Sequence, residues 1–329
     1  MKLAFLAFTE KGFALADSLA QALGGTVARC GKPDSLQTWT EKHFADADGL
    51  VFVGAVGIAV RAIAPYVRAK WTDPAVVAVD EAAHFAVALL SGHLGGANSL
   101  ARAISEVCGA QAVITTATDV NGVFAVDEWA SCQGLTVVNP QHIKLISGKL
   151  LAGDTIQVYS AYPVEGECPA GVELAKEFPA DVTVSVLKED GLLSLTPKAV
   201  VLGVGCRKDI PQATLESVWG RFSQETQLRE ESICAVASID LKKDEPGLVS
   251  FCQSHGWPFH TFTADQLKEV PGEFSPSVFV SRVTGVDNVC ERSAVALSGG
   301  TLIAKKFAAD GVTMAAGLKP FRLDWRWIR

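Results

Sequence analysis

The chain has 329 residues, 49% hydrophobic and 20% charged, so it can bury large cores and falls outside the composition of disordered chains. Its net charge of -7 at pH 7 argues against a nucleic-acid-binding protein, which would carry a basic domain. No apolar run approaches the roughly 18 residues of a membrane helix, and the N-terminus lacks the cleavage site of a signal peptide. We therefore expect a cytoplasmic protein of two or three domains, with neither nucleic-acid nor membrane partners.

The first 135 residues alternate short apolar runs with helical patterns. The expected strands are 3–8, 26–28, 50–53, 76–79, 85–90 and 112–115. The expected helices are 12–23, 35–44 with Ser35 as N-cap, 58 toward 65, 99–107 and 126–133, with a polar loop at 116–122. Strands that alternate with helices predict a mostly parallel sheet covered on both faces.

Residues 136–197 are rich in glycine and proline and contain only short strand patterns, at 155–159, 182–187 and 192–195. From residue 198 the alternation returns. Strands are expected at 199–203, 233–237, 278–280, 301–304 and 312–316, and helices after Pro211, from Pro246 and over 289–297. The predicted fold class is α/β, with two mostly parallel α/β domains, 1–135 and 198–329, flanking a small α+β central segment, 136–197.

The glycine-rich stretch 91–98 joins an expected strand to an expected helix and carries a single imidazole, His93. Glycine lets backbone amides approach an oxyanion, and a helix N-terminus adds unpaired donors and partial positive charge. The alternative is a tight turn whose glycines serve only backbone geometry.

Polar or glycine residues follow five of the expected strands. These loops are Thr9-Glu10, Gly54 to Gly57, Asp80-Glu81, Ser91 to His93 and Thr116 to Asn121. Ligands of open α/β sheets bind at the carboxyl edge of the strands, so we expect the five loops to gather at one such edge.

Acid–base groups in these loops suit a hydrolase, which needs a base for water and donors for the developing oxyanion. His93 could be the base or an oxyanion donor, while Glu81 or Asp119 could activate water or orient His93. A serine nucleophile is less well supported, because the chain lacks a G-x-S-x-G turn.

Cations also occur in loops at strand ends, although the whole chain is acidic. Arg61, Arg207, Lys242 and Lys243 could hold a ligand with several carboxylates, or could simply solvate the surface. Cys206, beside Arg207, could have a lowered thiol pKa or be a small buried side chain.

A metal-binding pattern is not evident. The eight cysteines form no C-x-x-C pair, and the six histidines show no ligand spacing such as H-E-x-x-H. We therefore expect free thiols and no protein-bound metal.

Several long motifs resemble one family. Segments 54–65, 79–81, 90–98 and 115–119 resemble the N-terminal domain of the cobalt-precorrin-5A hydrolase family, from the anaerobic cobalamin pathway. Segments 202–208, 237–248, 283–286 and 304–306 resemble the domain that this family shares with a small protein of the aerobic pathway. One departure lies at 291–296, where Arg292 and Ser293 replace an alanine-rich helix start after Glu291.

The resemblance implies a hydrolase that opens the ring A lactone of cobalt-precorrin-5A with water, giving cobalt-precorrin-5B and acetaldehyde. The cobalt arrives with the tetrapyrrole, so no cofactor is expected, and transient contact with neighbouring pathway methyltransferases is possible. Our expected catalytic residues are His93, Glu81 and Asp119. The expected substrate-binding residues are Gly54, Gly57, Arg61, Ser91, Gly92, Gly95, Gly96, Asn98, Thr116, Cys206, Arg207, Lys242 and Lys243.

Two other functions are alternatives to the hydrolase. A nucleotide-dependent enzyme would need a phosphate loop, and neither 54–57 nor 203–205 has a G-x-G-x-x-G or G-x-x-x-x-G-K-[ST] pattern. The remaining alternative is a non-catalytic carrier or scaffold for corrinoid intermediates.

Overall fold

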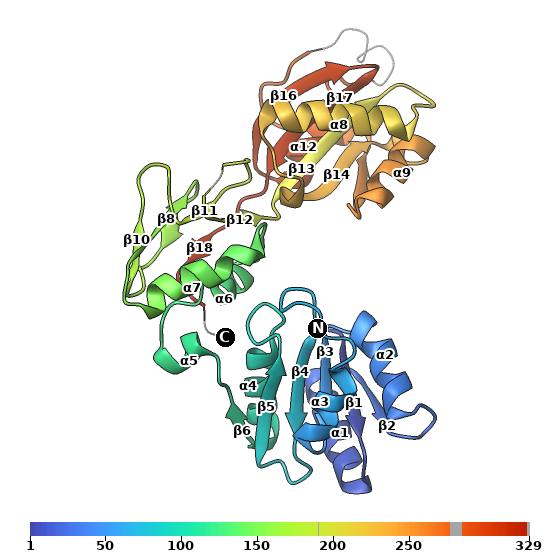
Figure 1. Ribbon diagram of the computed structural model, residues 1–329. Coiled ribbons are helices and arrows are strands. Elements are labelled where there is room, and N and C mark those ends of the chain that lie inside the picture. Colours follow the sequence, from blue (N-terminus) through green and yellow to red (C-terminus); the bar gives the residue numbers. More distant parts are fainter. Residues whose placement is uncertain (190, 277–284, 328–329) are drawn as a thin grey trace. The chain divides into compact units, whose positions relative to one another are not determined.

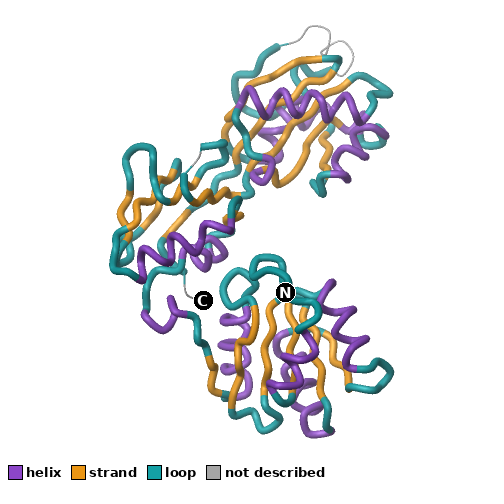
Figure 2. Tube along the Cα trace, in the orientation of Figure 1, coloured by secondary structure: helices purple, strands orange, loops and turns teal. Residues whose placement is uncertain are grey.

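The computed structural model describes residues 1–189, 191–276 and 285–327 (Figures 1 and 2). They form two compact units. Unit 1 comprises Met1–Cys132, Ile143–Asp154 and the C-terminal residues from Arg326, and unit 2 comprises Gln133–His142 and Thr155–Trp325. The predicted α/β class with mostly parallel sheets is confirmed. The domain boundaries at 135 and 197 remain a prediction, and most of 136–197 belongs to the same unit as 198–325.

Unit 1 is built on a six-stranded sheet of order β2-β1-β3-β4-β5-β6 (Figure 1). Its strands are β1 Leu3–Ala7, β2 Thr26–Arg29, β3 Gly49–Val53, β4 Ala75–Val79, β5 Phe85–Leu90 and β6 Gln111–Val113. The first four are mutually parallel, β5 is antiparallel to β4, and β6 is parallel to β5.

Helices cover both faces of this sheet because successive strand side chains point to opposite sides. From β1, Phe5 packs with α1 and α4 on one face, and Leu6 packs with α2 and α3 on the other. Each such fully buried large side chain stabilises the fold by roughly 1.5–3 kcal/mol. The helices that cover the sheet are α1 Glu10–Leu23, α2 Leu36–Asp46, α3 Val56–Ile63 and α4 Ala97–Cys108. The same unit also contains α5 Ala117–Asn121, α6 Val126–Cys132 and α7 Ile143–Leu151. Ser35 caps α2 as predicted, accepting a hydrogen bond from the Thr38 amide.

The antiparallel β4–β5 pair separates the polar loops that were expected together. Val76 lies opposite Leu90 and Val79 opposite Ala86, so the loop after β4 and the loop after β5 leave opposite edges of the sheet. The prediction of one shared edge is therefore wrong. Only residues 80–84 separate the two strands, which is enough for a hairpin but too short for the crossover that parallel strands require.

Unit 2 contains two five-stranded sheets and a two-stranded one. The middle sheet has the order β10-β8-β11-β12-β7, parallel except for the β12–β7 pair. Its strands are β7 Leu135–Val137, β8 Ile156–Ser160, β10 Val172–Leu174, β11 Val182–Val184 and β12 Leu193–Pro197. The short parallel pair is β9 Val164–Glu165 with β18 Leu323–Asp324.

The last sheet has the order β15-β14-β13-β17-β16, in which β13, β14 and β15 are parallel and β16 and β17 form an antiparallel hairpin. Its strands are β13 Val200–Cys206, β14 Ile233–Ile239, β15 Phe259–Phe262, β16 Thr301–Ala309 and β17 Val312–Leu318. The helices are α8 Gln212–Thr226, α9 Pro246–Ser254, α10 Ala264–Lys268 and α12 Cys290–Ser298. The strand predicted at 278–280 lies outside the described residues. Across the described part of the chain, no helix is both long and apolar enough to cross a membrane.

Glu291, at the departure from the family pattern, is fully buried in the first turn of α12. Its carboxylate accepts hydrogen bonds from the backbone amide of Ser275 at 2.7 Å, the side-chain amide of Asn288 at 2.7 Å and the backbone amide of Lys306 at 2.7 Å. The residue thus ties the segment before α12 to β16.

Candidate functional site around His93

The glycine-rich stretch forms a compact turn between β5 and α4. The Ala97 amide donates to the Ser91 carbonyl at 3.0 Å, and the Asn98 amide donates to the Gly92 carbonyl at 2.9 Å. A Cβ added at Gly95 would lie 2.2 Å from the Ser91 Cβ, so only glycine fits there. Two of the first helical amides are therefore used by the turn itself. This geometry fits the tight-turn interpretation, and a substrate-binding role for Ser91, Gly92, Gly95 and Gly96 stays a prediction.

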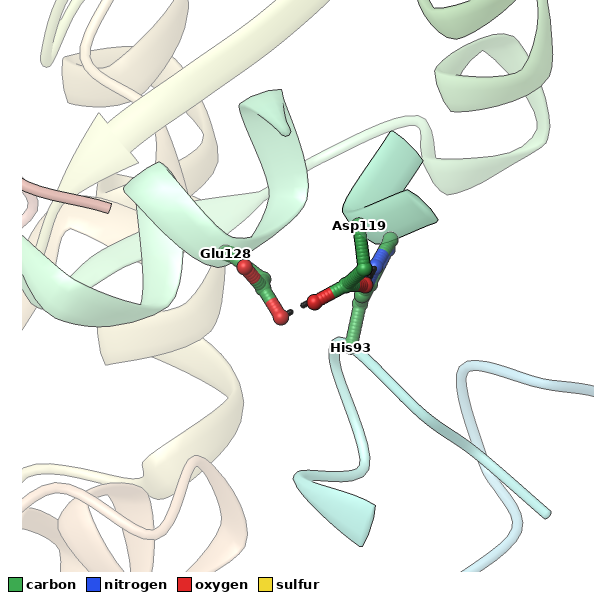
Figure 3. A group of neighbouring side chains, drawn as sticks. All are labelled: His93, Asp119 and Glu128. Carbon is green, nitrogen blue, oxygen red and sulfur yellow. Dashed lines mark hydrogen bonds and ion pairs between the residues drawn. The ribbon is translucent and has the colours of Figure 1, made fainter. Parts of the chain in front are cut away.

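The turn presents His93 to side chains from α5 and α6. His93 Nδ1 lies 3.1 Å from Asp127 Oδ2, and Nε2 lies 2.9 Å from Asp119 Oδ2. Nε2 is also 3.2 Å from Thr118 Oγ1 and 3.7 Å from Glu128 Oε1. Figure 3 shows the Asp119 and Glu128 side chains converging on the imidazole.

Asp119 is the centre of a hydrogen-bond network that includes three other predicted site residues, His93, Asn98 and Thr116. Its Oδ2 accepts from Asn98 Nδ2 at 3.0 Å and from the Thr116 hydroxyl, and its Oδ1 accepts from Arg102 Nη2 at 2.6 Å. Burial raises the pKa of the Asp119 carboxyl, but the bonds from Thr116, His93 and Arg102 outweigh it and hold that pKa below its usual range. Asp119 is therefore an anion at neutral pH. Most of the loop predicted at 116–122 is instead the short helix α5, Ala117–Asn121, with Thr116 at its N-cap position.

His93 is a cation in this setting. Each ring nitrogen faces a carboxylate oxygen, so each must carry a proton to make its hydrogen bond. Burial lowers the pKa of His93, but the hydrogen bonds and charges of Asp127 and Asp119, with the charge of Glu128, raise it to about 9. Because both ring N–H groups are used by carboxylates, the geometry disfavours His93 as a base, and its predicted role as an oxyanion donor stays a prediction.

Asp127 and Glu128 are site residues that the sequence analysis missed. Both begin α6, whose first five residues, 126–130, are all buried. The sequence did carry one signal for them: two adjacent acids stand within an otherwise apolar helical pattern. Carboxylates on a buried helix face need a partner, so the pair would have indicated a cation such as His93 nearby. Burial raises the pKa of the Glu128 carboxyl, although the charge of His93 opposes the rise.

A cavity of about 260 Å³ opens beside this cluster, lined by Arg102, Thr118, Asp119, Glu128 and Trp327 among others. That volume is below the range of about 300–1,000 Å³ typical of sites for drug-sized ligands. It can receive water and one edge of a larger molecule.

His93, Asp119 and Glu128 could also meet around a cation. One ligand atom from each lies within 4.8 Å of the other two. A metal ion bound to Nε2 would have to replace the proton that this nitrogen shares with Asp119 Oδ2. The expected absence of a protein-bound metal stays a prediction.

Glu81 does not join His93. It is exposed and accepts a hydrogen bond of 2.6 Å from the Thr9 hydroxyl, at the edge where Gly54, Gly57 and Arg61 also lie. Arg61 Nη1 donates to the Gly57 carbonyl at 3.2 Å. The expectation that Glu81 activates water beside His93, or orients it, is corrected, because β5 runs antiparallel to β4.

The candidate residues of unit 2 lie near the end of β13 and after β14. Burial raises the pKa of the Cys206 thiol to about 11 despite the opposing charge of Lys242, so the suggested lowered pKa is wrong. Lys242 pairs with Glu245 at 2.8 Å, while Lys243 is exposed. The Arg207 amide donates to the Gly311 carbonyl at 3.0 Å, and the binding role of these cations stays a prediction.

Known proteins resemble the chain over almost its whole length. The family models "Cobalamin synthesis G N-terminal" and "Cobalamin synthesis G C-terminus" match residues 38–119 and 200–317. Cobalt-precorrin-5A hydrolase of Salmonella typhimurium is 34% identical, covering 96% of this chain and 97% of that protein. The chain belongs to the cobalt-precorrin-5A hydrolase family. The same-named protein of Priestia megaterium is 31% identical over 84% of this chain and 80% of its own. Among solved structures, CobE, a protein from the cobalamin (vitamin B12) biosynthetic pathway, is 30% identical with a TM-score of 0.36, covering 37% of this chain and 92% of that one.

Proposed function

We propose that this chain is the hydrolase of cobalamin biosynthesis that opens the ring A lactone of cobalt-precorrin-5A with water, giving cobalt-precorrin-5B and acetaldehyde. The observation that carries the proposal is its 34% identity to a cobalt-precorrin-5A hydrolase over 96% of the chain. A similarity of that extent favours the enzyme over a carrier without chemistry.

The His93 cluster supports this chemistry in unit 1. Lactone hydrolysis develops negative charge on the carbonyl oxygen, which the positive charge of His93, next to the cavity residues Asp119 and Glu128, would help to stabilise. Arg102 lines the same cavity, and its five N–H donors allow it to hold a substrate carboxylate as well as Asp119. The small cavity suits the lactone edge of the substrate, with the rest of the macrocycle outside.

The proposal needs no cofactor beyond the substrate. Water is the second reactant, and cobalt enters and leaves within the tetrapyrrole. A cytoplasmic location agrees with eight free cysteines, and contact with neighbouring pathway methyltransferases remains part of the proposal.

The test is acetaldehyde release from enzymatically prepared cobalt-precorrin-5A, compared with a sample without the protein. We expect stoichiometric, protein-dependent acetaldehyde and a fall of at least about 100-fold in rate for His93→Gln, which cannot carry the charge. Tight binding of the tetrapyrrole without acetaldehyde would instead establish the carrier.

A further inference from the structure

We infer that Glu128 is the acid–base residue of this site: it takes the proton from the attacking water and returns it to the leaving oxygen. The inference rests on the proposed lactone hydrolysis. It assigns proton transfer to a residue that has not been given that role, and it changes the role of His93 from base to fixed positive charge.

His93 cannot take a proton from water in this arrangement. Its Nδ1 donates to Asp127 Oδ2 and its Nε2 to Asp119 Oδ2, so neither ring nitrogen has a free lone pair. A base must present a lone pair to the proton that it removes.

The two aspartates are engaged as well. Asp119 Oδ2 accepts from His93, Asn98 and Thr116, and Oδ1 accepts from Arg102. Asp127 Oδ2 accepts from His93, and its Oδ1 accepts from the Glu128 amide at 3.2 Å. Protonating Asp119 would weaken its bonds to His93 and Arg102, which hold the pKa of its carboxyl below the usual range and make it a weak base. Both oxygens of Asp127 are occupied by the bonds just described.

Glu128 is the carboxylate of the cluster that keeps an oxygen for the substrate. The residue is only 8% exposed, and its Oε1 is buried without a hydrogen bond from any described residue. The same residue lines the cavity with Thr118 and Asp119, and Figure 3 shows its side chain directed at the other members of the cluster. The charged ring nitrogen His93 Nε2, at 3.7 Å from Oε1, is beyond hydrogen-bond distance. A buried polar atom without a hydrogen bond is costly, and a bound water or a substrate hydroxyl would satisfy it.

The reaction can then be written with all atoms and protons accounted for. Water adds to the lactone carbonyl carbon while Glu128 takes its proton, and the carbonyl electron pair moves onto oxygen beside His93 and Arg102. Collapse of this tetrahedral intermediate breaks the ring C–O bond, and the leaving alkoxide takes the proton back from Glu128. The resulting alcohol then loses its O–H proton to Glu128 as its C–C bond to the macrocycle breaks. Acetaldehyde leaves, and the electron pair and the proton pass to the macrocycle.

The experiment compares single-turnover acetaldehyde release by wild-type protein, Glu128→Gln and the control Glu106→Gln, an exposed position on α4. We expect Glu106→Gln to match wild type, and Glu128→Gln to lose about 10²–10⁴-fold in rate with substrate binding and melting temperature retained. A Glu128→Gln rate within about threefold of wild type overturns the inference. Inactive wild-type protein would instead count against the proposed function, so failure of the function and failure of the Glu128 inference give different results.

Two further measurements complete the test. Wild-type protein is dialysed against a chelator and then supplied with Zn²⁺, Mn²⁺ or Co²⁺. If activity is lost and restored with the ion, and Glu128→Gln fails to bind that ion, Glu128 is a metal ligand and the inference is overturned. If Glu128→Gln does not fold, the wild-type pH profile decides: the rate must fall on the acid side as Glu128 takes up a proton, and a profile flat down to about pH 4 overturns the inference.

Discussion

The charge of His93 gives a prediction that can be worked out from the structure and measured directly. The pKa of His93 is raised from 6.5 to about 9, with Asp127 the largest raising influence against the lowering effect of burial. At about 1.4 kcal/mol for each pKa unit, the difference corresponds to about 3 kcal/mol that favours the folded state when His93 is protonated. The side chain is only 13% exposed, so solvent screening reduces this value little.

The sign follows from the direction of the change. Because the folded pKa lies above the unfolded one, the stabilisation is fully present below about pH 6.5 and is lost as pH rises through about 9. We therefore expect unit 1 to unfold more readily at pH 9.5 than at pH 6.5. Asp127→Asn should lower the pKa of His93 and reduce this dependence.

The assay is a proton NMR titration of the histidine ring Cε1–H signals from pH 5 to 10, with His93→Gln to assign the resonance. His43 is an internal control, because burial and then the charge of Lys42 lower its pKa. A His93 signal that titrates near pH 6.5 would refute the imidazolium and, with it, the reason for excluding His93 as a base.

Three further predictions concern other residues of the chain. Asp119→Asn should lower the free energy of unfolding by about 3 kcal/mol in urea titrations, because it leaves the partly buried cations of His93 and Arg102 without their carboxylate; a loss below about 1 kcal/mol would contradict this. Gly95→Ala should lower both stability and acetaldehyde release, because its Cβ would meet Ser91, whereas Gly148→Ala, with open space in α7, should leave activity unchanged and be neutral or slightly stabilising. Iodoacetamide at pH 8 should modify exposed Cys168 well before Cys206, whose thiol pKa is raised to about 11; mass spectrometry showing the reverse order would refute that burial effect.

Local patterns predicted most elements of the fold because apolar periodicity reports burial directly. The run 3–8 became β1, and the pattern 99–107 became most of α4. Strand direction was harder, since it depends on connection length and on which neighbour pairs with β5. The five residues between β4 and β5 would have indicated a hairpin, and that single reversal placed Glu81 and His93 at different edges.

The candidate site was predicted only in part, for a related reason. His93 and Asp119 were found because polar residues follow strands, and both strands, β5 and β6, end at the same edge. Asp127 and Glu128 lie on a buried helix that carries no strand-end signal, so their partnership with His93 appears only in the tertiary structure. For Cys206 the sequence suggested a lowered thiol pKa because cations are close by in the chain. In the structure, burial of the thiol raises that pKa more than the charge of Lys242 lowers it.

The central claim is that water opens the lactone, and the most direct measurement is the reaction in H₂¹⁸O with mass analysis of both products. Attack at the lactone carbonyl predicts one ¹⁸O in the newly formed carboxylate of cobalt-precorrin-5B, in step with acetaldehyde that is trapped before it exchanges oxygen with water. Acetaldehyde released with no label in that carboxylate would contradict lactone hydrolysis, and tetrapyrrole bound and recovered unchanged would contradict the enzyme altogether.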